Sequence, residues 1–262
     1  MKNNILVVLR VVLALALWWI IYKGYAAFIE PLFADSIPET LVLVLRSMVV
    51  PYTLGIGACY LVLRGMAKGE LLGDMKATPG LVIKGFLVQQ GLAMPVVIIV
   101  NIICNILGIT SNGMTADEIF GNNWLFYLIL LLVFAPIFEE LLFRKLILDR
   151  LLVLGEVPAI IISAVLFGLP HIYSQGVPLF FGTCIIALVF AYVRIHTGKM
   201  WPAILLHSLF NIYGSYFTLT LAKTAPTSVL VALLGLIILP VIAITLLIVQ
   251  SKKKKEVMNY CS

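Results

Sequence analysis

The segment NNWLFYLILLLVFAPIFEELLFRKLILDR, residues 122–150, decides the fold of this chain. A helix needs about 20 apolar residues to cross the hydrocarbon core of a bilayer, and this segment is long enough. It nevertheless carries two adjacent acids, Glu139 and Glu140, followed by Arg144. Ionisable residues inside a membrane span are costly and are functional candidates by default. The segment therefore predicts both a transmembrane helix and a candidate site.

The rest of the chain has the same apolar character. Of its 262 residues, 62% are hydrophobic and 11% are charged, whereas a soluble domain has about 25% charged residues. This composition excludes an ordinary soluble protein and predicts an all-α, polytopic membrane protein that forms a single transmembrane domain, residues 1–262. About eight transmembrane helices are expected, at residues 4–22, 40–63, 80–108, 122–150, 157–172, 178–195, 201–221 and 227–250.

The basic residues indicate how the chain is oriented. Apart from Arg10 and Arg46, which lie within spans, they gather on one side, and Lys23 and Lys223 are the exceptions. Cytoplasmic loops are rich in Lys and Arg, so both termini are expected in the cytoplasm of a cell membrane, and the short loops are typical of a bacterial protein. The net charge of +6 is thus a topology signal and does not indicate nucleic-acid binding. The residues on the basic side are Lys2, Arg64, Lys68, Lys76, Lys84, Arg144, Lys145, Arg150, Arg194, Lys199 and Lys252–Lys255.

The four cysteines are Cys59, Cys104, Cys184 and Cys261, and none is spaced as a CxxC pair. Three of them lie in apolar segments, where a cysteine is most simply a small hydrophobic side chain. A disulfide framework is therefore not expected.

Glu140 and Arg144 are four residues apart, so on a helix they share a face and can form an ion pair. This pairing leaves Glu139 without a partner in the local sequence. A buried carboxylate that is free to take up and release a proton suits acid–base chemistry.

His171 is expected to meet Glu139. The loop LGEVP, residues 154–158, joins their two spans, and the two residues are equally far from Gly155. In an antiparallel helical hairpin, residues equidistant from the turn lie at the same height. Because the charged residues around 145–150 should project beyond the hydrocarbon, the site is expected in the cytoplasmic half of the membrane.

The sequence HSLFN adds a third group of polar residues. His207 and Asn211 are four residues apart and point the same way from one helix, at a depth compatible with the Glu139–His171 pair. His196, in RIHTGK, is instead interpreted as a loop residue without function.

Two kinds of chemistry fit this set. A glutamate and a histidine can hold and deprotonate a water molecule, while a second histidine and an asparagine stabilise the oxyanion formed at a carbonyl. Alternatively, Glu139, His171 and His207 would make an acceptable catalytic zinc site with one open position. The residues alone do not decide between the two.

Three motifs resemble those of the CPBP family, which comprises the CAAX-type prenyl-protein endopeptidases and their bacterial relatives, also called Abi proteins. They are Glu-Glu-x-x-x-Arg at 139–144, Phe-x-x-x-His at 167–171 and His-x-x-x-Asn at 207–211, in order and each on its own apolar span. The resemblance covers residues 122–220 and implies an intramembrane endopeptidase. It implies that Glu139 activates water with help from His171, and that His207 and Asn211 form the oxyanion hole. It gives Glu140 and Arg144 a supporting role, and favours a mechanism without a metal.

By the same resemblance, the substrate is an apolar peptide or a membrane-protein segment that enters from the bilayer or the cytoplasmic side. Bacterial relatives are associated with bacteriocin self-immunity and with trimming of exported or signalling peptides. Two other classes remain open. One is a non-enzymatic membrane regulator or immunity protein that binds a partner through the same polar cluster. The other is a proton-coupled transporter, although the sequence shows no internal repeat of the kind that transporters often have.

Overall fold

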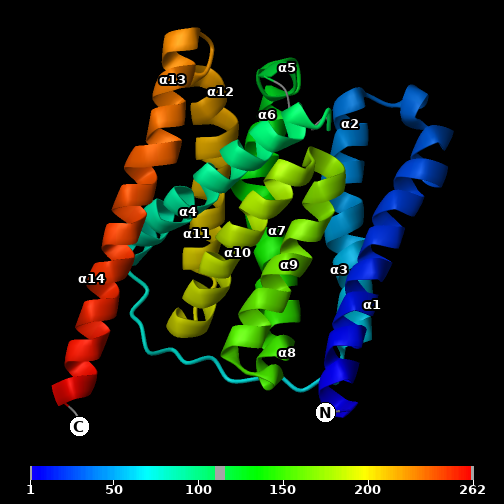
Figure 1. The fold of residues 1–262 in the computed structure, drawn as a ribbon. Helices are drawn as coiled ribbons and strands as arrows, with labels where there is room; N and C mark the ends of the chain where they lie inside the picture. The colour runs from blue at the N-terminus through cyan, green and yellow to red at the C-terminus, as the bar shows by residue number, and fades with distance from the viewer. Residues whose placement is uncertain (1, 110–115, 261–262) are drawn as a thin grey trace.

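The computed structural model describes residues 2–109 and 116–260, and Cys261 lies outside them. The described residues form helices and their connections, with no strand among them (Figure 1). In a bilayer a helix satisfies all of its backbone hydrogen bonds internally, so apolar segments of this length take that form. The first half of the chain contains α1 (Lys2–Gly24), η1 (Tyr25–Ile29), η2 (Glu30–Leu32), η3 (Ala34–Ser36), α2 (Glu39–Val44), η4 (Leu45–Gly55), α3 (Ile56–Leu63), α4 (Pro79–Ile106) and α5 (Ala116–Phe120).

The second half contains α6 (Trp124–Ile129), η5 (Leu130–Phe134), α7 (Ala135–Glu140), η6 (Leu141–Leu148), α8 (Asp149–Leu151), η7 (Leu152–Leu154), α9 (Glu156–Gln175), α10 (Val177–Thr197), α11 (Trp201–Asn211), η8 (Ile212–Phe217), α12 (Thr218–Leu221), α13 (Ala225–Leu233), η9 (Leu234–Ile238) and α14 (Leu239–Tyr260). Many of the η segments have the wider turns of a π-helix and continue directly from one α-helix into the next.

Seven helices of the described chain are long and apolar enough to cross a membrane. They coincide with seven of the eight predicted spans, which confirms a polytopic all-α protein. The eighth predicted span, 201–221, is also helical throughout, but it is not among the seven. Its polar residues, His207 and Asn211 among them, make it less apolar than the others. The seven are Asn4–Leu32, Glu39–Leu63, Pro79–Ile106, Trp124–Leu154, Glu156–Gln175, Val177–Thr197 and Ala225–Lys252.

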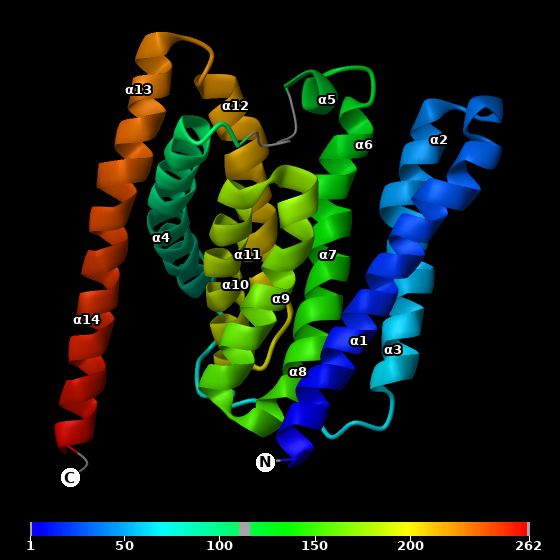
Figure 2. The same ribbon diagram turned by 45° about the vertical axis from the view of Figure 1, so that its right-hand side comes forward.

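The helices form a bundle with a central group and two flanks. Helices α7, α9, α10 and α11 lie in the middle, with α1, α2 and α3 on one side and α4, α13 and α14 on the other (Figures 1 and 2). The ends of the chain lie at the same end of the bundle, here called the terminal end (Figure 1). The turn between α12 and α13 lies at the opposite end, here called the distal end (Figure 2).

The predicted hairpin is confirmed at Gly155, where the helical run from Trp124 ends and α9 begins. Gly155 has φ of 99°, a conformation that favours glycine because it has no Cβ. The sharp reversal lets α9 pack back against η6. This hairpin places the acids of α7 opposite the second half of α9.

The first span is longer than expected. It continues past residue 22 as far as Leu32, so Glu30 lies within the helical run and not in a loop. Glu30 is buried and pairs with Arg46, with Oε1 and Nη1 3.2 Å apart. Arg10 donates instead to the Val62 carbonyl oxygen at 2.8 Å. Both arginines inside the first two spans therefore have polar partners.

The connection of residues 64–78, here called the strap, runs beneath the central helices at the terminal end (Figures 1 and 2). The Gly69 amide donates to the Asp149 carbonyl oxygen and the Met75 amide donates to the His196 carbonyl oxygen, each at 2.8 Å. A side chain at Gly69 would overlap with the backbone of Leu152, so only glycine allows this close approach. The strap is thus held against the ends of α8 and α10.

The interpretation of His196 as a loop residue is wrong. It lies in the last turn of α10 and is largely buried. Its Nδ1 is 2.7 Å from Asp74 of the strap, and its Nε2 is 3.0 Å from Glu156 at the start of α9. The short basic and polar stretch around His196 resembles a loop in sequence. In the structure it is helical, and two acids that are distant in the chain contact the His196 ring. His196 therefore links the strap to two central helices.

Candidate active site

The candidate site is centred on α7, a short α-helical stretch between the wider turns of η5 and η6. Such wide turns inside helices are frequent at functional sites. Consecutive residues on a helix are about 100° apart in direction. The two adjacent acids therefore face different surroundings: Glu140 is fully buried, while the Glu139 side chain is 20% exposed.

Glu140 lies in a buried polar chain. Its Oε2 accepts a hydrogen bond from Arg144 Nε at 2.8 Å, and both side chains are fully buried. Arg144 Nη1 donates to Ser163 Oγ at 2.9 Å, and Glu140 Oε1 lies 3.1 Å from His207 Nδ1. The predicted Glu140–Arg144 ion pair is confirmed. A buried charge is tolerated only when it is paired in this way, so the pair fixes Glu140 and, through it, the His207 ring.

Glu139 has a partner that its local sequence did not offer. Tyr52, from η4, donates its hydroxyl to Glu139 Oε1 at 2.9 Å across a sequence separation of 87 residues. The Tyr52 ring packs against Phe134 and Phe138, with ring centroids 5.6 Å and 5.4 Å away. The other carboxylate oxygen, Oε2, lies 3.9 Å from His207 Nε2. One oxygen is thus held by the phenol, while the other faces the histidine.

His171 is oriented by its own helix. Its Nδ1 lies 3.0 Å from the Phe167 carbonyl oxygen, one turn earlier in α9. A carbonyl oxygen can only accept, so Nδ1 carries the proton and Nε2 is left as an acceptor. Both imidazole rings pack against Phe167, at centroid distances of 5.3 Å for His171 and 5.6 Å for His207.

Asn211 lies one turn after His207, as its spacing predicted. Its Nδ2 donates to the Leu131 carbonyl oxygen at 2.8 Å. An amide nitrogen has two N–H groups, so one remains for a ligand. Ser208, directly after His207, donates to the Leu132 carbonyl oxygen at 2.8 Å. These bonds hold α11 against the helix that carries Glu139.

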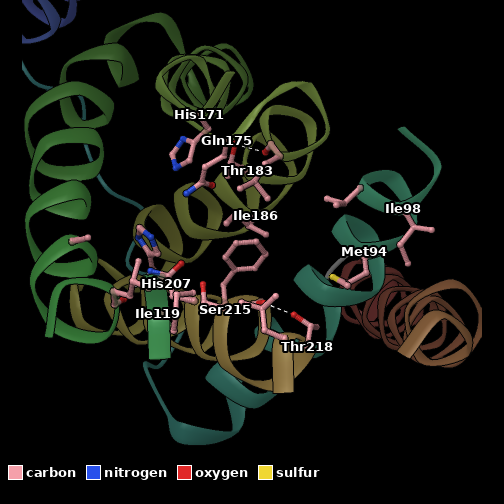
Figure 3. A pocket seen from close by; sticks show the side chains of 18 of the residues that line it. Met94, Ile98, Ile119, His171, Gln175, Thr183, Ile186, His207, Ser215 and Thr218 are labelled. Carbon is pink, nitrogen blue, oxygen red and sulfur yellow. Dashed lines mark hydrogen bonds between the residues drawn. The ribbon is translucent and has the colours of Figure 1, made fainter. Parts of the chain in front are cut away.

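A cavity of about 460 Å³ joins these groups. Glu139, His171, His207 and Asn211 all line it, and His171 and His207 lie on separate walls (Figure 3). No hydrogen bond or ion pair joins Glu139 to His171 among the described residues, and the two instead share the cavity. The remaining lining is predominantly apolar. The arrangement therefore offers two proton acceptors and two potential donors around one shared cavity.

The three residues considered as zinc ligands are not assembled into a metal site in the described part of the chain. Within residues 2–109 and 116–260, no group of three or more His, Cys, Asp or Glu side chains is close enough to hold a metal ion. Glu139, His171 and His207 line the same cavity but do not converge on one point. His207 also directs one of its two nitrogens toward Glu140. The absence of a metal requirement remains a prediction.

Fold and site together define a class: a polytopic helical membrane protein with glutamate and histidine side chains around an internal cavity. Residues 121–213 match the family model described as "Type II CAAX prenyl endopeptidase Rce1-like". This segment is therefore similar to the type II CAAX prenyl endopeptidases, as the three motifs indicated, and that similarity supports peptidase activity in general terms. No curated protein and no solved structure matched the chain. The six predicted site residues all lie within the matched segment.

Tyr52 is the site residue that the sequence analysis missed. It lies outside the matched segment, in the second span, and no motif surrounds it. The available signal was weak: a tyrosine directly after Pro51, in the middle of an apolar span. Pro51 lies inside η4, where the turns are wide.

Proposed function

We propose that the protein is an intramembrane endopeptidase that hydrolyses an amide bond of an apolar, membrane-associated peptide with an activated water molecule. The observation that carries this proposal is the cavity that Glu139, His171, His207 and Asn211 share. The match of residues 121–213 to a peptidase family supports the same reaction class.

The proposed reaction begins with a water molecule in the cavity between Glu139 and His171. Glu139 Oε2 and His171 Nε2 both have free lone pairs, so the water can donate to each of them. As its oxygen bonds to the carbonyl carbon of the substrate, Glu139 accepts the proton. Tyr52 holds the other carboxylate oxygen, which keeps Oε2 directed at the site.

The carbonyl oxygen becomes an oxyanion in this step. The free N–H of Asn211 and the Nε2 side of the His207 ring are the proposed donors to it. When the intermediate collapses, the C–N bond breaks and Glu139 returns its proton to the departing amine. Glu140 and Arg144 do not touch the substrate in this scheme. They are positioning residues that set the His207 ring.

Glu139→Gln tests the catalytic role because it keeps the shape of the side chain and removes the base. The wild type and the variant, purified in detergent, would be given internally quenched apolar peptides. A general base typically contributes about 10²- to 10⁴-fold, so cleavage should fall by that factor. Glu39→Gln, at an exposed acid that does not line the cavity, is the matched control and should cleave normally. Full cleavage by Glu139→Gln would instead favour a non-enzymatic binding role for the cluster.

In cells, the proposed setting is a bacterial cytoplasmic membrane with both termini inside, because the basic residues gather at the terminal end. Bacteriocin self-immunity or maturation of an exported or signalling peptide are the processes that such an activity would serve. Comparing the membrane peptidome of wild-type and Glu139→Ala cells would identify the substrate. Peptides that change only in the variant support the proposal, and identical peptidomes refute it in that organism.

A further inference from the structure

The cavity extends from the site toward the distal end of the bundle. Beyond His171, its wall includes Gln175 at the end of α9. Beyond Asn211, it includes Ser215 of η8 and Thr218, the first residue of α12 (Figure 3). Ser228, in the first turn of α13, also lines it. All of these positions lie between the site and the α12–α13 turn. The open space therefore leads away from the chain termini.

The path from the site to the terminal end is closed by packed side chains. Every one of the following apolar side chains beyond Glu139 in that direction is at most 3% exposed: Leu142, Phe143, Ile147, Leu148 and Leu151. Protein interiors of this kind pack as densely as organic crystals and leave no passage for a peptide. The strap covers the same end from outside, through its bonds to Asp149 and His196. Two independent features thus close one end of the bundle, while the cavity runs toward the other.

The lining also limits what can bind. Its described polar residues beyond the catalytic set are uncharged, and it contains no Lys or Arg among the described residues. A buried carboxylate or ammonium group needs a partner of opposite charge. A peptide terminus or a charged side chain would find no such partner along the wall, apart from the site itself. An uncharged apolar segment, with its backbone bonded to the hydroxyl and amide groups, fits this surface best.

We propose that the substrate reaches Glu139 from the membrane face opposite the termini, as an uncharged apolar segment that is recognised without its terminal carboxylate. This proposal rests on the proposed peptidase function and reverses the cytoplasmic entry expected from the sequence. With the termini in the cytoplasm, the substrate is a segment that export or membrane insertion has already delivered to the outer face. The reaction that supplies the substrate is therefore a translocation step.

Cysteine labelling tests the access route without any catalysis. The background carries Cys184→Ala and Cys261→Ala, and each variant adds one cysteine whose rate of labelling is measured. Ser215→Cys places the cysteine in the cavity, Lys223→Cys places it at the distal end, and Ser251→Cys places it at the terminal end. A membrane-impermeant maleimide is added to spheroplasts before and after permeabilisation. Because a charged reagent crosses hydrocarbon poorly, Ser215→Cys should label about tenfold faster from the face that labels Lys223→Cys. Labelling of Ser215→Cys from the Ser251→Cys face would overturn the proposal.

Protection of the same cysteine tests the substrate class. The Ser215→Cys variant, combined with Glu139→Gln to prevent cleavage, is labelled in detergent with and without a short peptide of leucine, alanine and valine. The peptide with both ends blocked should slow labelling at least as well as the peptide with a free carboxylate. A peptide in which lysines replace two leucines should give no protection. Protection that requires the free carboxylate, or no protection by any peptide, would refute this substrate class.

The two proposals fail in different ways. If Ser215→Cys is labelled and protected as expected, but Glu139-dependent cleavage is absent in detergent, then the site binds such segments from the distal face and is not a peptidase. If cleavage depends on Glu139 while labelling comes from the terminal end, the peptidase stands and the access route is wrong.

Discussion

Replacing Tyr52 with phenylalanine should slow the proposed reaction without unfolding the protein. The change removes the single hydroxyl that donates to Glu139 Oε1 at 2.9 Å. It keeps the ring that packs against Phe134 and Phe138. A hydrogen bond to a charged group contributes about 1.5–3 kcal/mol, and each 1.4 kcal/mol corresponds to about a tenfold change. If the bond acts by directing the carboxylate in the transition state, kcat should fall by about 10- to 100-fold with little change in KM.

The assay is cleavage of a quenched apolar peptide by purified protein, read as kcat and KM, alongside a thermal unfolding curve. Tyr60→Phe, at a half-exposed tyrosine of α3 with no described role, is the matched control. A double variant with Glu139→Gln supplies the decisive readout. Since Tyr52 is proposed to act through Glu139, adding Tyr52→Phe to Glu139→Gln should cost nothing further. A normal kcat in Tyr52→Phe, or a loss that adds fully to that of Glu139→Gln, would refute this reasoning.

Three further outcomes are expected. Asn211→Ala removes a proposed oxyanion donor and should lower kcat by about 10²- to 10³-fold, measured with the same peptide; a normal kcat would remove Asn211 from the mechanism. Arg144→Met leaves the Glu140 carboxylate buried without its cation, and breaking a buried pair costs about 3–5 kcal/mol. We therefore expect a lower temperature in a thermal unfolding curve, or loss of folded protein on detergent gel filtration. An unchanged unfolding temperature would contradict this expectation. Treatment with a chelator should leave cleavage unchanged, and stoichiometric zinc by elemental analysis together with chelator-sensitive cleavage would establish the metal mechanism instead.

The parts of the structure that the sequence predicted are those set by local rules. The membrane requires helices, so the spans follow from apolar length. The Glu140–Arg144 pair follows from helical spacing, and the placement of the Glu139 and His171 helices side by side follows from a hairpin that turns at Gly155. Each of these depends on residues close together in the chain or on a single turn.

The parts of the structure that the sequence analysis missed depend on contacts between segments that are distant in the chain. Tyr52 reaches Glu139 only because η4 packs against η5 and α3 packs against η6, the segments on either side of α7, and no local pattern reports that packing. His196 has the flanking residues of a loop, yet Asp74 and Glu156 enclose it in the fold. The direction in which the cavity extends could not be predicted from the sequence either, because it depends on which end of the bundle is filled by side chains.

The strap has a consequence for how the protein is made. Ribosomes deliver residues 64–78 well before the partners that hold them, because Asp149, Glu156 and His196 lie much later in the chain. Chains are synthesised from the N-terminus, so this segment waits unattached at the membrane surface until α9 and α10 have been inserted. Completion of the seal at that end of the bundle is therefore a late event in biogenesis, because a nascent chain that stops before α10 lacks the bond between Met75 and His196.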